Sequence, residues 1–277
     1  MKISKVLNNN SVVVKEDDQE KIVMGLGVGF QKRKNDLVDR SKIEKIFVMK
    51  EENDKFQELL STLPVEHIDV AEEIISYAEG ELLVPLSNHV HISLTDHLSF
   101  AIERLEKGYT IQNKLLNEIR VLYKPEYEIA QWAQQLIKER LGVSIPDDEV
   151  GHIALHLHTA KMGSKSMQNT MQLASIIRDA IDMIENEFDM TIEETSINYQ
   201  RLLTHLRFAI NRVEEGEPFH SMDPEMLELL QMKFGKAFGT AQKIADFLLA
   251  EYDIHFPLSE VGYITLHIQR LTDLKGK

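Results

Sequence analysis

Two segments of the chain, HLSFAIERLEKG at residues 97–108 and HLRFAINRVEEG at residues 205–216, share eight of twelve residues. A second pair follows them, because EVGHIALH at 149–156 corresponds to EVGYITLH at 260–267. The copies are offset by 108 residues in the first motif and by 111 in the second, a difference that one surface loop accommodates. The repeat indicates a duplicated unit of roughly 100 residues, since solenoids use shorter and more numerous repeats.

Both units are predicted to be helical. Phe56, Leu59, Leu60 and Leu63 follow the spacing of an amphipathic helix that ends at Pro64. The same pattern predicts helices over Ile68–Leu82, Thr95–Lys107, Asn113–Leu122, Glu126–Leu141, Asp147–Ala160, Asn169–Phe188, Glu193–Glu214, Pro224–Lys233, Lys236–Glu251 and Ser259–Leu271. We place the join between the units near residues 162–166. The sequence therefore predicts two homologous all-α helical-bundle domains, at 56–165 and 166–277.

The first 55 residues follow a different pattern. Short β-branched runs predict strands at Ile3–Leu7, Ser11–Lys15, Lys21–Met24 and Ile43–Met49, with a turn signal at residues 8–10. We therefore expect a small N-terminal antiparallel β-sheet domain over residues 1–55. A sheet of four short strands with one buried face has low stability alone, which favours pairing of two copies into a homodimer.

Charge separates the same two parts of the chain. The 277 residues carry a net charge of −14, which at first argues against a nucleic-acid partner. Residues 1–50, however, contain eleven Lys and Arg against seven Asp and Glu, a net charge of +4, which leaves −18 for the other 227 residues. Such asymmetry indicates a nucleic-acid-binding end on an otherwise acidic protein.

The composition excludes several classes of protein. The sequence contains no cysteine, which excludes disulfides, cysteine-ligated zinc and thiol nucleophiles. No apolar run approaches the ~20 residues of a membrane span, and the polar start of the chain does not fit a signal peptide. We therefore expect a cytoplasmic protein that does not insert into a membrane.

The repeat selects four of the eleven histidines. His97 and His156 of the first unit correspond to His205 and His267 of the second. A lone histidine on a helix is usually structural, but both copies carry histidine at these two positions although they differ elsewhere. We therefore predict that these four side chains are functional.

Metal binding is one interpretation of these histidines. His152 and His156 share a helical face, as in a helical metal-dependent phosphohydrolase. Tyr263 stands at the position that corresponds to His152, however, so the second unit would have lost this ligand. The metal interpretation stays open but is weakened.

Phosphorylation at nitrogen is the second interpretation. A neutral imidazole is an adequate nucleophile near pH 7. A phosphoryl group adds a charge of about −1.5 to −2, which would repel acidic neighbours or recruit Arg104 and Arg212 on the same helices. Near a symmetric interface such a charge could open or close a dimer. This chemistry fits histidines that are duplicated without further metal ligands.

Over essentially its whole length the chain resembles the BglG/SacY family of bacterial transcriptional antiterminators. KISKVLNNN at 2–10 and MGLGVGFQK at 24–32 resemble two segments of the family's co-antiterminator RNA-binding domain. The phosphorylated histidine motifs of its two phosphotransferase-system (PTS) regulation domains resemble SLTDH at 93–97, IALH at 153–156, LTHL at 203–206 and ITLH at 264–267. Within the family, the chain is most similar to the sucrose-responsive members through DDQEKIVMG at 17–25 and ALHLHTA at 154–160.

The resemblance implies an RNA-binding antiterminator. As a homodimer it would hold a leader-mRNA hairpin that overlaps a terminator in a sugar-utilisation operon, with sucrose as the expected sugar. The implied contacts are phosphate contacts from Lys5, Lys32 and Arg33, base-edge contacts from Asn8, Asn10 and Gln31, a stacking or dimer contact from Phe30, and close backbone approach at Gly25 and Gly27. Such groups suit the exposed bases of RNA loops and bulges. Leu26 stands where some members carry a basic residue, so that contact is lost here.

Regulation is implied histidine by histidine. His97 and His156 match the positions through which a sugar-specific PTS permease inhibits family members. His205 and His267 match those through which the phosphocarrier protein HPr often activates them. The protein would accept phosphoryl groups without being an enzyme, and would need no cofactor, metal or DNA. Two other classes remain as alternatives, the phosphohydrolase above and a two-domain DNA-binding regulator, although no helix-turn-helix pattern precedes the helical units.

Overall fold

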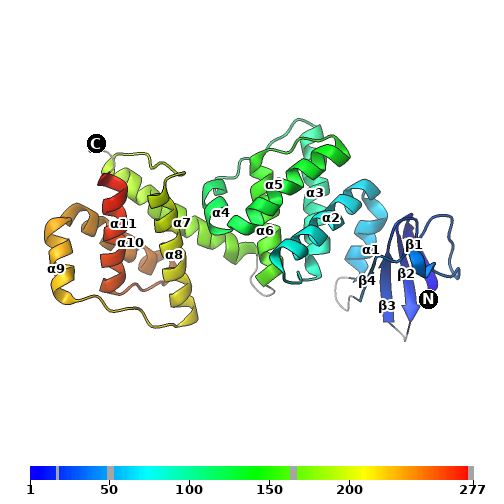
Figure 1. Cartoon of the computed structure of the whole chain (residues 1–277), viewed down its shortest axis with the longest axis horizontal. Helices are drawn as coiled ribbons and strands as arrows, with labels where there is room; N and C mark the ends of the chain where they lie inside the picture. Colours follow the sequence, from blue (N-terminus) through cyan, green and yellow to red (C-terminus); the bar gives the residue numbers. More distant parts are fainter. Residues whose placement is uncertain (17–18, 49–52, 163–166, 274–277) are drawn as a thin grey trace. The chain divides into compact units, whose positions relative to one another are not determined.

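The computed structural model describes residues 1–16, 19–48, 53–162 and 167–273 (Figure 1). The chain begins with four strands, β1 (Lys2–Asn8), β2 (Ser11–Glu16), β3 (Gln19–Met24) and β4 (Lys45–Phe47), with a short 3-10 helix at Arg40–Lys42. The helices are α1 (Asn53–Thr62), α2 (Val65–Leu82), α3 (His89–Glu106), α4 (Leu116–Leu122), α5 (Lys124–Leu141), α6 (Asp147–Met162), α7 (Met167–Phe188), α8 (Ile197–Glu215), α9 (Pro224–Lys233), α10 (Gly235–Tyr252) and α11 (Leu258–Thr272). The predicted fold class, an N-terminal antiparallel sheet followed by helical units, is confirmed.

The four strands form an antiparallel sheet in the order β1-β2-β3-β4. Side chains of successive strand residues point to opposite faces, and in β2 the residues Val12, Val13 and Val14 are all buried. Val12 pairs with Val23 on one face, and Val13 pairs with Ile22 on the other. Both faces of the sheet are therefore covered, and the expectation of a single buried face is wrong.

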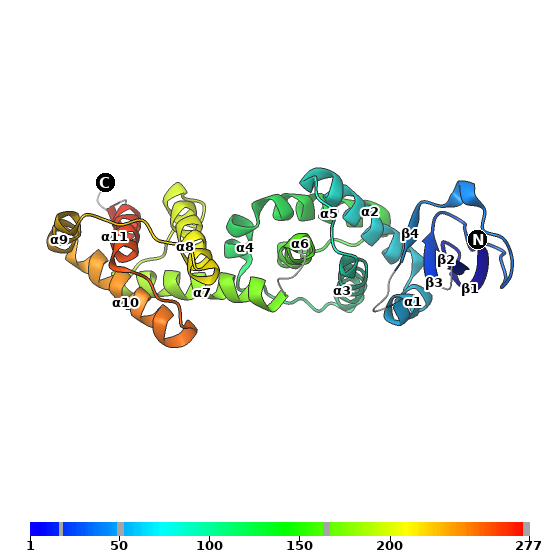
Figure 2. The ribbon, with the colours of Figure 1, turned by 90° about the horizontal axis from the view of Figure 1, so that it is seen from below.

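Different parts of the chain cover the two faces. The first face packs Ile3, Val12, Val14 and Val23 against Val28 and Val38 of the long β3–β4 connection. The second face packs Val13, Ile22, Met24 and Phe47 against Phe56 and Leu60 of α1, Ile68 of α2 and Ile92 of α3. In Figures 1 and 2, α1 lies directly beside the sheet. The chain thus buries by itself the face that we expected to need a partner.

The contacts within the chain define two compact units. The first comprises residues 1–113 and 125–165, and the second comprises residues 114–124 and 166–277. Helix α4 belongs to the second unit, where the Tyr199 hydroxyl donates to Glu118 over 3.0 Å and Arg178 lies 3.4 Å from the same carboxylate. In the first unit α3 packs on α6, side by side in Figure 2, and in the second α8 packs on α11. These two helix pairs carry the repeated motifs.

Several predicted boundaries differ from the structure. Helix α3 begins at His89 and not at Thr95, because its first turns also pack on the sheet, through the ring of His91 against Phe47 and through Ile92. The last predicted strand is confined to Lys45–Phe47, and Met49 lies outside the described residues. Residues 163–166 of the predicted join also lie outside them.

Replacing Gly25 by alanine should destabilise the sheet. A Cβ atom at Gly25 would lie 1.8 Å from the Lys42 carbonyl oxygen, so backbone must move. We expect Gly25→Ala to lower the free energy of unfolding by about 1–3 kcal/mol in urea titrations. Gly239→Ala is the matched control, because the Gly239 position in α10 is open, and alanine there should add roughly 1 kcal/mol of helix stability. Equal stability of Gly25→Ala and the parent would contradict this account.

Candidate phosphoacceptor and RNA-binding sites

The four histidines selected by the repeat form two pairs of the same geometry. In the first unit, the rings of His97 on α3 and His156 on α6 have centroids 4.8 Å apart and planes inclined by 36°. In the second unit, His205 on α8 and His267 on α11 lie 4.9 Å apart at 33°. The close agreement indicates one site built twice.

Helix packing places each pair. Next to His97 along α3, Leu98, Ala101 and Ile102 are buried, and Ile153 and Leu157 are buried beside His156 on α6. These apolar residues fix the rotation of both helices about their axes. The imidazoles are thereby held at the seam between the helices, partly shielded from water, with 19% of the His97 side chain exposed.

A buried carboxylate completes each site. Glu149 Oε2 lies 3.4 Å from His97 Nε2, and Glu260 Oε2 lies 3.4 Å from His205 Nε2. The Glu149 and Glu260 side chains are only 1% and 2% exposed. Neither glutamate is among the residues predicted from the sequence, although both belong to the repeated Glu-Val-Gly motif that carries His156 and His267.

The two copies differ in whether an arginine forms an ion pair with this carboxylate. Arg104 pairs directly with Glu149 through Nη2 and Oε1. In the second unit, the Arg212 Nε atom lies 4.0 Å from Glu217, and its guanidinium group lies over the ring of Phe219. Burial alone would raise the pKa of Glu149, but His97 and Arg104 hold that pKa below its usual range. Burial dominates at Glu260 and raises its pKa.

Burial favours the neutral form of three of these histidines, His156, His205 and His267. Burial, followed by the nearby His97, lowers the pKa of His156 to about 3. Burial and the nearby His205 lower the pKa of His267 to about 4, and burial also lowers the pKa of His205. A neutral ring keeps one nitrogen lone pair for attack on phosphorus. Each of these three rings can therefore act as a nucleophile near neutral pH.

The geometry gives no support to a metal centre. Within the part of the chain that the structure describes, no group of three or more His, Cys, Asp or Glu side chains is placed to hold a metal ion. The His152 ring lies 5.6 Å from His97, while Tyr263 lies 6.0 Å from His205 in the second copy. His152 thus adjoins the first pair, and a phenol takes its place in the second.

In the N-terminal sheet, the β1–β2 turn and the loop after β3 form one continuous surface. The Asn10 side-chain oxygen accepts from the Gly27 amide over 2.8 Å, and the Asn10 carbonyl accepts from the Gly25 amide over 3.0 Å. The Asn10 amide donates to the Asn8 side chain over 2.8 Å. The Phe30 ring, 54% exposed, follows this loop. These five predicted RNA-contacting residues therefore lie together.

The remaining predicted RNA-contacting residues are more dispersed. Gln31 and Arg33 are exposed just after the loop, and Gln31 has a left-handed φ of 54°. The Lys32 amine donates to the Leu37 carbonyl over 3.2 Å. Lys5 is exposed on β1, opposite Val13. Gly27, with φ of 67°, adopts a conformation that favours glycine. At Gly25 the Lys42 carbonyl oxygen lies so close that it leaves no room for a Cβ atom.

Comparison with known families gives matches along most of the chain. Residues 1–56 match the CAT RNA binding domain, and residues 72–160 and 178–271 match the PRD domain. Transcription antiterminator LicT of Bacillus subtilis (strain 168) is 39% identical over 98% of this chain and 99% of its own length. The Beta-glucoside operon antiterminator of Dickeya chrysanthemi is 36% identical over 98% of this chain and 96% of its own length.

Two further comparisons concern GlcT. Protein GlcT of Staphylococcus aureus (strain MRSA252) is 31% identical over 98% of this chain and 96% of its own length. The crystal structure of GlcT CAT-PRDI aligns with a TM-score of 0.54 and 34% identity, over 58% of this chain and 97% of that one. The antiterminators among these relatives are regulators and not enzymes, which overturns the phosphohydrolase alternative at His152 and His156.

None of the described helices has the length and hydrophobicity needed to cross a membrane.

The depressed pKa of His156 should make folding sensitive to acid. The folded-state pKa is about 3, whereas an unfolded histidine titrates near 6.5, so the stabilisation is complete above pH 6.5 and is lost as the pH falls toward 3. Between pH 7 and pH 5 we expect the parent to lose about 2 kcal/mol more than His156→Asn in urea unfolding. His255→Asn, at an exposed position, should follow the parent. Parallel losses in the parent and His156→Asn would contradict the assignment.

Proposed function

Because the chain belongs to the BglG family of transcription antiterminators, we propose that it binds a leader-RNA hairpin and that phosphorylation of its paired histidines controls this binding. The observation that carries the proposal is the duplicated pair, with rings 4.8 and 4.9 Å apart in two PRD domains that follow an RNA-binding domain. The hairpin would overlap a terminator, so that the two RNA folds exclude each other. Protein binding adds its free energy to one fold, and polymerase then reads through.

RNA contact is proposed at the surface formed by the β1–β2 turn and the loop after β3. Asn8, Asn10 and Gln31 carry amides that can read base edges, and the exposed Phe30 ring can stack on an unpaired base. Lys5, Lys32 and Arg33 supply positive charge for phosphates. Gly27 allows the tight turn of this loop, because its positive φ of 67° favours glycine.

Phosphoryl transfer would use His97, His156, His205 and His267 as acceptors. A neutral ring nitrogen attacks the phosphorus of a donor phosphohistidine, a new N–P bond forms, and the donor's N–P bond breaks. The proton that the acceptor ring loses balances the one that the released imidazole takes up. The dianion that results is placed beside a buried carboxylate, Glu149 or Glu260. Repulsion between the phosphoryl group and this carboxylate would change the packing of α3 on α6 or of α8 on α11. Arg104 or Arg212 is the cation that could pair with the phosphoryl group.

The proposed partners follow from this chemistry. A sugar-specific PTS enzyme II would act on His97 and His156, and HPr on His205 and His267. We propose a division into residues 1–55 for RNA, 56–165 for the first regulatory domain and 166–277 for the second, with a cytoplasmic homodimer as the active form.

A sucrose operon is proposed as the target, on the sequence similarity at 17–25 and 154–160. Asp17 and Asp18 of the first segment lie outside the described residues. The name of the relative from Dickeya chrysanthemi refers instead to a β-glucoside operon. Read-through of a sucrose leader and of a β-glucoside leader, measured side by side with the same protein, decides between the two sugars.

RNA binding should depend strongly on salt through Lys5 and Arg33. For hairpins selected from a randomised-loop pool against the full chain, we expect Lys5→Gln and Arg33→Gln each to reduce the slope of log K against log[salt] by about 0.7–0.9. Lys138→Gln, on an exposed position of α5, removes the same charge away from the proposed surface. An unchanged slope in both test variants would exclude these residues as phosphate contacts.

Charge at the histidines should change transcription read-through. In a purified transcription assay on a terminator-bearing leader, we expect His97→Asp to lower read-through and His205→Asp to raise it, because a carboxylate imitates part of the phosphoryl charge. His255→Asp serves as the control, since this exposed histidine has no counterpart in the repeat. Identical read-through with the parent and both test variants would refute the regulatory role.

A further inference from the structure

We propose that helix α2 carries an acidic binding surface for the RNA-binding loops of the same chain, and that RNA and this surface compete for Asn10. The surface consists of Asp69, Glu72 and Glu73. This inference rests on the proposed function, because it assumes that the turn and loop around Asn10 contact RNA. It identifies the group that occupies them when RNA is absent.

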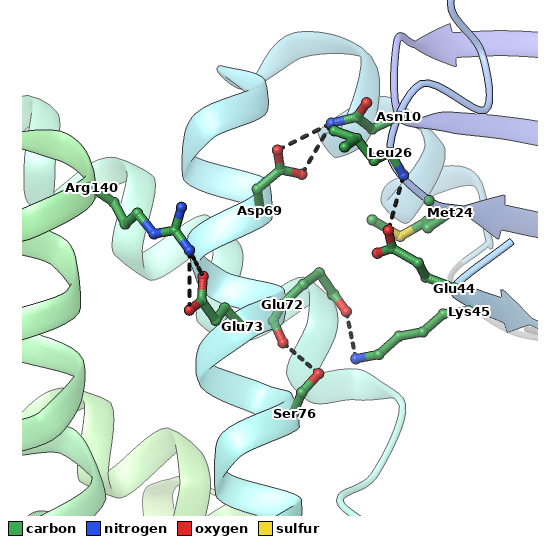
Figure 3. Close-up of a pocket in the computed structure, with 11 residues that line it drawn as sticks. Asn10, Met24, Leu26, Glu44, Lys45, Asp69, Glu72, Glu73, Ser76 and Arg140 are labelled. Carbon is green, nitrogen blue, oxygen red and sulfur yellow. Dashed lines mark hydrogen bonds and ion pairs between the residues drawn. The ribbon is translucent and has the colours of Figure 1, made fainter. Parts of the chain in front are cut away.

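Direct hydrogen bonds engage the side chains of Asn8 and Asn10 in the turn. The Asn10 side-chain amide donates to the Asp69 carboxylate, with distances of 3.1 and 3.4 Å to its two oxygens (Figure 3). The Asn8 side-chain amide donates to the Leu60 carbonyl of α1 over 2.8 Å. The Asn10 side-chain oxygen already accepts from the Gly27 amide, so both ends of the Asn10 side chain are engaged in bonds within the chain.

An ion pair lies beside these hydrogen bonds. The Lys45 amine of β4 contacts Glu72 Oε2 at 3.0 Å, and Glu72 Oε1 contacts His91 Nδ1 at 2.5 Å. The His91 ring packs edge-on against Phe47 of β4, with centroids 4.5 Å apart. Burial alone would raise the pKa of Glu72, but His91 and Lys45 hold that pKa below its usual range.

Apolar packing supports the polar contacts. Phe56 and Leu60 of α1 and Ile68 of α2 are each 1% exposed and pack with Ile22 and Phe47 of the sheet. Burial of side chains of this size stabilises a contact by about 1.5–3 kcal/mol each. The association of the sheet with α1 and α2 is therefore an extensive packed interface.

The charges around the loop disfavour RNA in this arrangement. A cavity of about 440 Å³ lies between the loop after β3 and α2, and its lining includes the carboxylates of Glu44, Asp69, Glu72 and Glu73. The two cations of the lining are already paired, Lys45 with Glu72 and Arg140 with Glu73 at 3.1 Å (Figure 3). A phosphate entering here would face four carboxylates without a free cation in the lining.

The consequence is a choice between two arrangements. RNA that takes the Asn10 donor now bound to Asp69 must displace this carboxylate, and RNA phosphates near the loop must move away from the acidic side chains of α2. Any free energy that holds the loops on α2 is then subtracted from RNA affinity. His91, which packs on the sheet, and His97, a predicted phosphoacceptor, lie six residues apart on α3, so one helix joins the interface to the histidine pair.

RNA affinity of the full chain tests the proposal. The probe is a hairpin selected from a randomised-loop pool, and its binding to the parent, Asp69→Ala and Glu72→Gln is measured by fluorescence anisotropy. Asp69 is exposed, so its replacement leaves the core intact. We expect Asp69→Ala to bind about tenfold more tightly, as the loss of one charged hydrogen bond predicts. Glu81→Ala is the control, because it removes the same charge from an exposed position in the last turn of α2.

Amide hydrogen exchange provides the second measurement. In Asp69→Ala without RNA, amides of residues 8–11 and 65–72 should exchange faster than in the free parent if the loops leave α2. In the parent, addition of RNA should make the amides of residues 65–72 exchange faster, because α2 loses the loops while RNA covers residues 8–11. If the parent binds the hairpin and Asp69→Ala binds no more tightly than Glu81→Ala, the inference fails while the proposed function stands. If neither the parent nor the variants bind any hairpin at low salt, the proposed function fails, and the inference fails with it.

Discussion

The packing of α3 on α6, repeated by α8 on α11, is the contact on which both regulatory units depend. It encloses a carboxylate, Glu149 or Glu260, at a position with almost no access to water. An isolated buried carboxylate is costly, so the surroundings must either supply a cation or keep the group protonated. The charge of the facing histidine therefore affects the energy of this carboxylate. A new charge on that ring would change the electrostatic energy of the helix–helix contact.

The same helices also organise the N-terminal part of the first unit. Helix α3 carries His97 toward α6, and its first turns pack against the sheet through His91 and Ile92. Helix α2 contributes Ile68 to the same core and presents Glu72 to Lys45. The sheet and the first histidine pair therefore share helix α3, on which α2 packs. A change in either place has a physical route to the other, through elements with few alternative packings.

The sequence predicted much of this arrangement, because periodicity and repetition are local signals. The duplicated motifs identified both helical units and selected the histidines that the structure brings into pairs. Burial of the second sheet face could not be predicted, since it depends on α1 folding back onto Val13 and Ile22. The early start of α3 was missed for a related reason, as Val90, Ile92 and Leu94 alternate like a strand and are buried by contacts distant in sequence. The carboxylates Glu149 and Glu260 were visible in the repeat, but only the fold shows that they face His97 and His205.

The two histidine sites differ in their arginine contacts because the sequences of the two units differ just beyond the twelve-residue motif. Arg104 and Arg212 occupy the same place in the twelve-residue motif, yet only Arg104 pairs with its buried carboxylate. Just beyond the motif, the second unit has Glu217 and Phe219, which hold the Arg212 guanidinium group. The corresponding positions of the first unit are Tyr109 and Ile111, which offer no carboxylate. A negative charge added to His97 would therefore compete with Glu149 for an arginine that is already paired, whereas Arg212 near His205 is not paired with Glu260. Two changes outside the shared motif thus give the duplicated sites different arginine contacts around the same pair of imidazoles and the same buried carboxylate.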